Sequence, residues 1–262
     1  MPIRVQNDLP AKEILERENI FVMDEHRAVH QDIRPLKIGL LNLMPLKEDT
    51  ELQLLRSFSN TPLQVDVTFV MVSNHQSKNT SANHLNKFYV RFQDVKDQNF
   101  DGFIITGAPI EQIPFEEVDY WEEMKEIMEW TKTHVTSTIY LCWGAQAAYY
   151  YHFGIDKYSL KKKIDPAKIK ACEDLMVLAE SVEAGVFLAM TKDGRQIFVM
   201  GHPEYDRMTL DEEYKRDKSK GLPIEIPCNY YPDDNPENRP LLTWRSNANN
   251  LYTNWLNYYV YQ

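Results

Sequence analysis

Short apolar runs alternate with amphipathic helical stretches through the first half of the chain, and this alternation restricts the fold more than any other feature. Apolar runs bounded by turn residues predict strands, and apolar residues at every third or fourth position predict helices. We expect strands at 36–43, 64–72, 102–106 and 137–141, and helices at 49–58, at 83–92 and along the stripe Val118, Trp121, Met124 and Met128. This order predicts an α/β fold with a mostly parallel sheet flanked by helices.

The second half of the sequence mixes strands with irregular chain. Four further elements are expected there: strands in hairpin-like order at 176–179, 185–190 and 196–200, and a final helix at 247–259. Residues 222–240 contain five prolines and predict an extended arm. No repeat or linker divides the chain, so we expect one α/β domain over residues 1–262. An N-terminal extension (1–34) and a C-terminal cap, the arm and helix of residues 222–262, would flank its sheet.

Charge and apolar content exclude several classes of protein. The 29 Lys and Arg residues against 39 Asp and Glu residues give a net charge of −10, which disfavours nucleic acid or an anionic membrane as a partner. The longest apolar stretches, 38–46 and 139–151, are shorter than the roughly 20 residues of a membrane-spanning helix. The first residues lack the apolar segment of a signal peptide. Three cysteines make no disulfide framework, so we expect a soluble cytoplasmic protein.

The strongest local signal is a cysteine between a predicted strand and a predicted helix. Cys142 directly follows the strand at 137–141, and Gly144 and small residues then open a helix. This is the arrangement of a nucleophile elbow with Cys in place of Ser, at the carboxyl end of a sheet. A helix N-terminus favours a thiolate, and the backbone N–H groups of the turn can hold an oxyanion. Taken alone, the segment fits a catalytic or an inert cysteine, whereas Cys172 and Cys228 lack this setting.

A histidine at the end of another predicted strand supplies the second signal. Pro203 favours extended geometry at His202, and in extended chain residues i and i+2 point the same way. His202 and Glu204 are therefore expected to project together, which lets a carboxylate orient an imidazole. Alone the segment fits an ordinary polar turn better. With Cys142 at the end of a second strand, the catalytic interpretation is the stronger one.

Two other features are weaker. His26 and His30 have helical spacing, but no third ligand accompanies them, so no metal site is expected. The turn Gly107-Ala108-Pro109 follows the strand at 102–106. It can supply backbone donors near Cys142, or it can be a simple turn.

Three segments resemble the homoserine O-acyltransferase family of methionine biosynthesis, within the class I glutamine amidotransferase-like fold. They are 104–109 (IITGAP), 141–147 (LCWGAQA) and 201–206 (GHPEYD). The resemblance extends to the first residues, MPI, and to 254–259 (NWLNYY), and so covers almost the whole chain.

The resemblance implies a two-step acyl transfer with defined residue roles. An acyl-CoA would acylate Cys142, and the hydroxyl group of L-homoserine would then attack the thioester. By position His202 would be the general base and Glu204 its orienting partner. Lys163 matches a substrate-binding lysine of the family, and Arg216 an arginine that binds the amino acid, where a guanidinium can bond the homoserine carboxylate bidentately. Acyl-CoA is a co-substrate here, and no cofactor or metal is implied.

Glu111 predicts acetyl-CoA rather than succinyl-CoA as the acyl donor. In the family, Glu at the matching position accompanies acetyl transfer and Gly accompanies succinyl transfer. A carboxylate beside the acyl group would also repel the carboxylate of a succinyl group and occupy its space. The alternative is that Glu111 is one of many acidic surface residues, and succinyl transfer then stays open.

The sequence departs from the family pattern after Lys163. The family has a segment of a few tens of residues there, with a Pro-His-Ser-Arg-like motif whose Ser contacts substrate. Here Lys163 and Ile164 run directly into Asp165 and Pro166. The segment is deleted, or it is a mobile loop absent from the printed sequence. The second option is favoured because deletion would remove part of the acceptor pocket, and no substrate-binding Ser is assigned.

Two other functions remain as alternatives. A glutamine amidotransferase subunit would use the same nucleophile, although Trp143 stands where glutaminases usually have a small residue. A non-enzymatic binding module would need His202 or Glu204 to be misplaced relative to Cys142. The sequence leaves the oligomeric state open, a homodimer included.

Overall fold

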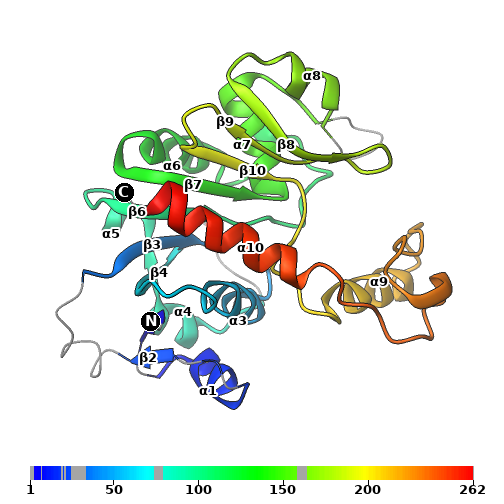
Figure 1. Cartoon of the computed structure of the whole chain (residues 1–262), viewed down its shortest axis with the longest axis horizontal. Helices are drawn as coiled ribbons and strands as arrows, with labels where there is room; N and C mark the ends of the chain where they lie inside the picture. The colour runs from blue at the N-terminus through cyan, green and yellow to red at the C-terminus, as the bar shows by residue number, and fades with distance from the viewer. Residues whose placement is uncertain are drawn as a thin grey trace.

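The computed structural model describes residues 3–6, 8–18, 20, 22–24, 34–73, 79–157 and 164–261 (Figure 1). The strands are β1 (Ile3–Val5), β2 (Val22–Asp24), β3 (Leu36–Leu41), β4 (Val65–Met71), β5 (Tyr89–Arg91), β6 (Phe100–Ile105), β7 (Val135–Leu141), β8 (Leu175–Ser181), β9 (Gly185–Thr191) and β10 (Gln196–Val199). The α-helices are α1 (Pro10–Arg17), α3 (Lys47–Phe58), α4 (Ala82–Phe88), α5 (Phe92–Val95), α6 (Trp121–His134), α7 (Trp143–Phe153), α8 (Pro166–Ala171), α9 (Thr209–Ser219) and α10 (Arg245–Trp255). Short helical turns are η1 (Phe115–Glu117), η2 (Pro232–Asp234) and η3 (Leu256–Val260). None of the helices in these ranges is long and apolar enough to cross a membrane.

One ten-stranded sheet runs through the described part of the chain. Its order is β2-β1-β4-β3-β6-β7-β10-β9-β8, and β5 pairs with β4. The strands from β1 to β7 pair in parallel, and β10 is parallel to β7, whereas β8, β9 and β10 pair antiparallel. The predicted α/β class, the mostly parallel sheet and the hairpin-like order of the later strands are confirmed.

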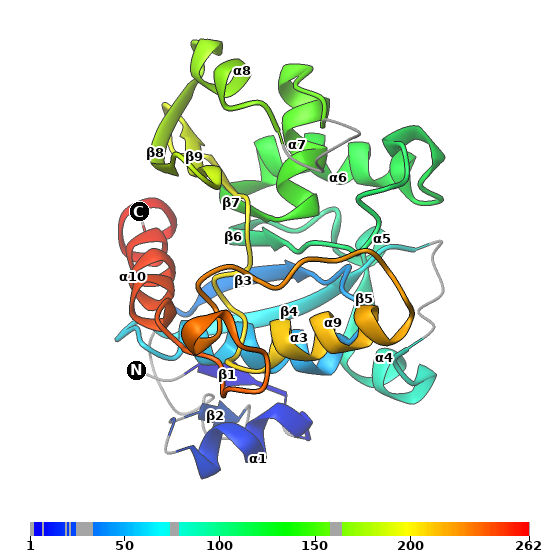
Figure 2. The same ribbon diagram turned by 90° about the vertical axis from the view of Figure 1, so that its right-hand side faces the viewer.

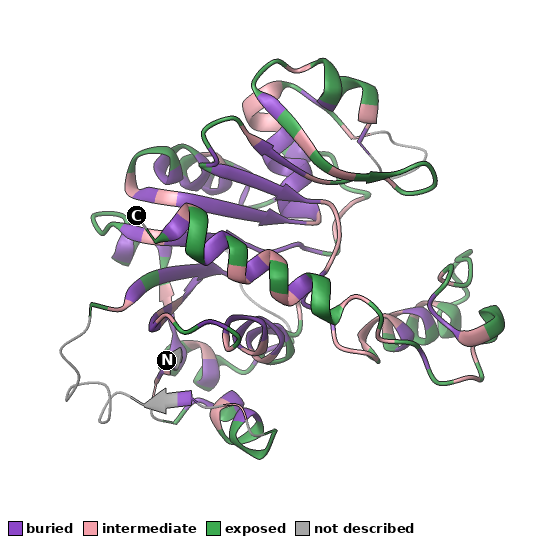
Figure 3. Ribbon diagram, in the orientation of Figure 1, coloured by how far each residue is buried: buried purple, intermediate pink, exposed green. Residues whose placement is uncertain are grey.

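Helices cover both faces of the sheet, as the alternation of strands and helices predicts (Figure 2). On one face α6 and α7 pack on Phe103, Ile105 and Tyr140. On the other face α3 and α10 pack on residues of the opposite parity, Ile104 and Ile139 among them. The central strands are therefore buried on both sides (Figure 3), which explains their nearly continuous apolar sequence.

Three details differ from the sequence-based expectation. The N-terminal extension is not separate from the sheet, because β1 pairs with β4 and β2 pairs with β1. The helix expected at 83–92 ends at Phe88, and the next three residues pair with β4 as β5. Val118 lies before α6 rather than on it, although it is buried in the same apolar cluster.

The C-terminal part covers the sheet with a helix and carries a projecting arm. Trp255 of α10 is buried and donates a hydrogen bond from Nε1 to Ser137 Oγ on β7, at 3.0 Å. The segment with α9 and the arm of residues 222–240 extends away from the sheet (Figure 1). It has a small apolar cluster of its own, built on Tyr214, Tyr230 and Tyr231. The predicted arm and final helix are thus present.

Candidate active site

Three neighbouring strands deliver the predicted site residues to one edge of the sheet. β6, β7 and β10 pair in parallel, so their carboxyl ends lie side by side. Gly107 follows β6, Cys142 follows β7 and His202 follows β10. This is the edge at which open α/β sheets bind their ligands.

Cys142 occupies a strained turn between β7 and α7. Its backbone has φ 48° and ψ −114°, a conformation that residues with a Cβ rarely adopt. Its N–H bonds Val199 O of β10 at 2.8 Å, and α7 begins at the next residue. A Cβ on Gly144 would lie 2.8 Å from the carbonyl oxygen of Thr106, so only glycine lets α7 approach β6 this closely. The predicted elbow is present.

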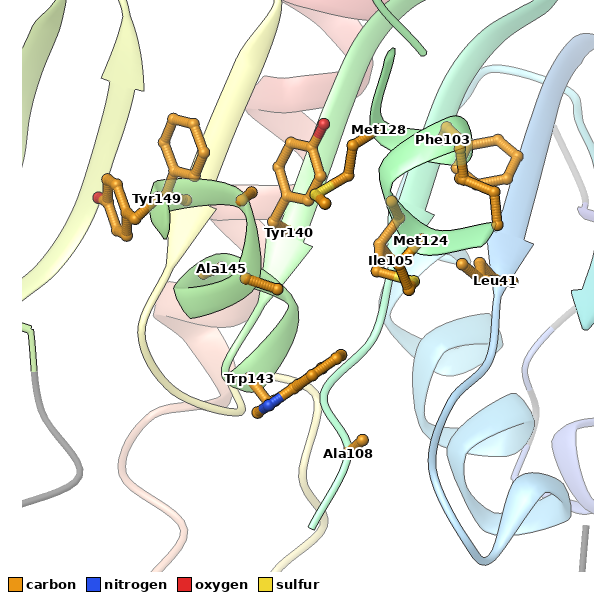
Figure 4. Packing of buried hydrophobic residues seen from close by; sticks show 14 of the residues in the cluster. Leu41, Phe103, Ile105, Ala108, Met124, Met128, Tyr140, Trp143, Ala145 and Tyr149 are labelled. Carbon is orange, nitrogen blue, oxygen red and sulfur yellow. The ribbon is translucent and has the colours of Figure 1, made fainter. Parts of the chain in front are cut away.

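The first turns of α7 pack into the core and fix the elbow from below. Trp143 and Ala145 belong to the buried cluster that also contains Tyr140 of β7 and Met128 of α6 (Figure 4). Trp143 is fully buried. The residue directly after the cysteine therefore points into the protein interior and anchors the helix that starts there.

His202 lies between Glu204 and Cys142. Its Nδ1 donates to Glu204 Oε1 at 2.7 Å, and Glu204 itself is 4% exposed. The imidazole also makes a hydrogen bond with the side chain of Cys142. Burial lowers the pKa of His202, but the Glu204 carboxylate and the Cys142 sulfur outweigh it, so the pKa is raised well above its usual 6.5. The structure thus brings together the three residues predicted to be catalytic.

Two neighbours that the sequence analysis did not single out for this purpose hold the imidazole in place. Tyr205 stacks on the His202 ring with centroids 4.2 Å apart and planes 18° apart, and its hydroxyl group donates to Glu213. A Cβ on Gly107 would lie 3.1 Å from both Cys142 Cβ and His202 Cε1. Gly107 is therefore the floor on which the two catalytic side chains meet, in addition to forming a turn.

Lys47 is a charged residue near this edge that sequence reasoning missed. It is 7% exposed, donates from Nζ to the carbonyl oxygens of Asn42 and Met44, and has a pKa that burial lowers to about 8 against the opposing effect of Glu51. With Ala108, which follows Gly107, it lines a cavity of about 360 Å³. Its position just after β3 was the available signal, because polar residues after parallel strands gather at one edge.

Arg216 lies on a larger cavity that reaches the catalytic residues. This cavity, of about 1060 Å³, is lined by Glu204 and Tyr205 on one side and by α3 and α9 on others. Arg216 of α9 lines it, with its side chain 45% exposed and its Nε bonded to Asp217 at 2.7 Å. The predicted amino-acid ligand thus opens onto the same space as Glu204.

The remaining predicted residues have different outcomes. Glu111 is partly buried in the turn after β6, between Ile110 and Ile113, which line the smaller cavity. Lys163, His26 and His30 lie outside the described residues. Within the described ranges, no group of three or more His, Cys, Asp or Glu side chains is placed to hold a metal ion.

Comparison with known proteins identifies the family. The family model described as homoserine O-succinyltransferase matches residues 2–166 and 162–262, which together are almost the whole chain. The chain belongs to this family. The resemblance inferred from the three motifs is therefore confirmed. A Thermoplasma acidophilum protein described as part of a GMP synthase matches in structure with a TM-score of 0.42 and 17% identity, over 66% of this chain and 87% of that one, which is too weak to carry an argument.

Several curated relatives are similar over the full length of the chain. Proteins named homoserine O-acetyltransferase from Lachnoclostridium phytofermentans and Agathobacter rectalis are 60% and 58% identical, over 100% of this chain and 98% and 95% of theirs. One of the same name from Geobacillus sp. strain WCH70 is 54% identical over 100% of this chain and 98% of its own. The family description names succinyl transfer, whereas these relatives are named for acetyl transfer.

The comparisons also locate the departure from the family pattern. Each of these alignments spans 295 positions against the 262 residues of the chain, a difference of 33. The two parts of the family match meet at residues 162–166. This is the place, directly after Lys163, where the sequence analysis found a segment of a few tens of residues to be missing.

Proposed function

We propose that the chain transfers an acetyl group from acetyl-CoA to the hydroxyl group of L-homoserine through a thioester on Cys142, giving O-acetyl-L-homoserine for methionine biosynthesis. The observation that carries the proposal is the His202 imidazole held between Glu204 and Cys142 at a strained elbow. The names of relatives that are 50–60% identical over the full chain support the choice of substrates. The contact of all three side chains favours an enzyme over a binding module.

In the first half-reaction the Cys142 sulfur attacks the carbonyl carbon of acetyl-CoA. A carbon–sulfur bond forms to Cys142, and the bond from that carbon to the CoA sulfur breaks. His202, protonated beside the Cys142 thiolate, gives its proton to the departing CoA sulfur and becomes neutral. Glu204 accepts Nδ1–H, so Nε2 is the nitrogen that handles this proton. Backbone N–H groups at the elbow are suited to hold the oxyanion.

In the second half-reaction the homoserine hydroxyl group attacks the thioester carbon. Neutral His202 takes the hydroxyl proton as the carbon–oxygen bond forms and the bond to Cys142 breaks. The thiolate then stands again beside a protonated imidazole, which is the state that began the cycle. Glu204 stabilises the imidazolium in both steps.

Substrate groups are assigned to the two cavities by their chemistry. The guanidinium of Arg216 would bind the homoserine carboxylate in the larger cavity, beside Glu204. Lys163 is assigned to substrate binding by its match to the family. The smaller cavity beside Gly107, lined largely by apolar side chains, would take the acyl group. Acetyl-CoA is a co-substrate, and the proposal needs no further cofactor.

Mass spectrometry tests the covalent mechanism directly. Incubation with acetyl-CoA in the absence of homoserine should place one acetyl group on the Cys142 peptide, and Cys142→Ala should take up none. Added homoserine should remove the group and release O-acetyl-L-homoserine. An adduct on Cys172 or Cys228 instead, or none at all, would rule out the mechanism. Glutamine hydrolysis by the unmodified protein would favour the amidotransferase alternative.

Succinyl transfer is the second candidate, because the family model carries that description. Glu111 lies next to two residues of the proposed acyl cavity, where a carboxylate would repel a succinyl group. The test compares kcat/KM for acetyl-CoA and succinyl-CoA in the unmodified protein and in Glu111→Gly. We expect acetyl-CoA to be preferred and the variant to shift toward succinyl-CoA. An initial preference for succinyl-CoA, or a ratio that Glu111→Gly leaves unchanged, would contradict the acetyl assignment.

A further inference from the structure

Arg56 joins three distant parts of the chain behind the catalytic residues. Its Nε and Nη2 each donate to one oxygen of Glu18 at 2.7 Å, and its Nη1 donates to both oxygens of Asp206 at 2.7 and 2.8 Å. Glu18 caps the C-terminus of α1 in the N-terminal extension. Asp206 belongs to the loop that carries His202 and Glu204. One guanidinium therefore links the N-terminal helix, α3 and the catalytic loop.

The clamp is anchored on a rigid element and is not an ordinary surface ion pair. The Arg56 side chain is 14% exposed, whereas exposed pairs such as Arg17 with Glu13 are 77–78% exposed. Leu54 and Leu55, which precede Arg56 on α3, are fully buried in the core. Charge-assisted bonds from a planar guanidinium to two carboxylates fix orientation as well as distance. Asp206 is therefore held at a defined position relative to the sheet.

Asp206 is close enough in sequence to pass this constraint to the catalytic pair. It lies two residues after Glu204 and four after His202, and Tyr205 between them stacks on the imidazole. Arg245, at the start of α10, bonds the same Asp206 oxygen at 3.2 Å. A loop fixed on two sides keeps the imidazole at bonding distance from Cys142, and a misplacement of about 1 Å can cost a hundredfold in rate.

We propose that Arg56 is a positioning residue that holds the His202–Glu204 loop through Asp206, with Glu18 of the N-terminal extension completing the clamp. The inference rests on the proposed roles of Cys142, His202 and Glu204. Arg56 also lines the larger cavity, so binding the homoserine carboxylate is the competing role. Its bonds to two carboxylates favour positioning, because the guanidinium edges are already used.

Four variants separate these roles: Arg56→Lys, Arg56→Gln, Asp206→Asn and the Arg56→Gln/Asp206→Asn double variant. Arg17→Gln is the matched control, since it removes an exposed arginine beside Glu18. The readouts are the melting temperature, kcat and KM for both substrates, and the pH profile of Cys142 alkylation by iodoacetamide. Alkylation needs no acyl donor or acceptor, so it reports the Cys142–His202 contact even where acetyl transfer itself is absent.

We expect Arg56→Gln and Asp206→Asn each to lower kcat about tenfold to a hundredfold with little change in KM for homoserine. Alkylation should need a higher pH in both, because a displaced imidazolium stabilises the thiolate less. The double variant should be little worse than either single variant, since both remove one contact. Arg56→Lys should recover part of the rate, and Arg17→Gln should match the unmodified protein.

Two results would overturn the inference. In one, the variants lose melting temperature but keep kcat and the alkylation profile, which would make the clamp purely structural. In the other, KM for homoserine rises tenfold or more at unchanged kcat, which would make Arg56 a substrate ligand. Loss of acetyl transfer in the unmodified protein, with the alkylation shifts intact, would instead count against the proposed function alone.

Discussion

Replacement of Glu204 by glutamine removes one charge from the centre of the site and leaves its shape nearly unchanged. The carboxylate accepts Nδ1–H of His202 at 2.7 Å and is 4% exposed. At an effective dielectric constant of about 20, charges roughly 4 Å apart interact by about 4 kcal/mol. Since one pKa unit is about 1.4 kcal/mol, this sets an upper limit of about 3 units. We expect Glu204→Gln to lower the pKa of His202 by about 1–3 units.

Burial fixes the direction of this shift as downward. Desolvation favours the neutral imidazole, and the raised pKa exists only because Glu204 and Cys142 outweigh it. Because the folded-state pKa is raised, protonated His202 stabilises the fold below pH 6.5, and this contribution is lost as the pH rises through the folded-state value. The variant should therefore lose more free energy of unfolding at pH 6 than at pH 10.

NMR titration of the His202 ring measures the shift, and denaturant unfolding at the two pH values measures the stability. Glu180→Gln on β8 is the control, because it removes the same charge from an exposed residue paired with Lys170. The rate of acetyl transfer should fall as well, since the imidazolium of both half-reactions loses its partner. A His202 pKa that stays the same or rises in Glu204→Gln would refute the electrostatic reasoning.

Three further variants test the remaining parts of the site. His202→Ala should lower kcat by about 10²–10⁴-fold, the usual effect of losing a general base, and near-normal turnover would contradict its role. Arg216→Lys should raise KM for homoserine while acetylation of Cys142 from acetyl-CoA stays intact, because lysine lacks the bidentate fork; a lost first half-reaction would place Arg216 elsewhere. Gly107→Ala should lower kcat at least tenfold with the fold retained by circular dichroism, because its Cβ would lie 3.1 Å from Cys142 Cβ and His202 Cε1; unchanged kcat would mean that these side chains move aside freely.

The central strands could be predicted from the sequence because strands buried on both faces must be apolar almost throughout. The three-residue strands could not. Ile3–Val5, Val22–Asp24 and Tyr89–Arg91 are too short to show a period, and each becomes a strand only by pairing directly or indirectly with β4. Tyr89–Arg91 read as the end of a helix because local pattern cannot register a neighbouring strand edge.

The site was predictable where residues follow strands and obscure where they lie on helices. Cys142 and His202 each come directly after an apolar run, and parallel pairing then places them together without further information. Lys47 and Arg56 are charged residues on α3, where sequence alone suggests a solvated helix face. Their burial depends on what packs against α3, namely the catalytic loop and the N-terminal helix, and no local pattern encodes that.

The strain at Cys142 connects the sheet to the chemistry. A positive φ at a residue with a Cβ costs roughly 1–3 kcal/mol and persists only where the surroundings fix it. Here β10 binds the Cys142 N–H through Val199 O, and the absence of a Cβ at Gly144 lets α7 close against Thr106 O. Both neighbouring strands therefore hold the turn that presents the sulfur. Because β10 also delivers His202, the strand that fixes the nucleophile is the one that positions its base, and the two catalytic groups keep their distance through a single pairing of β7 with β10.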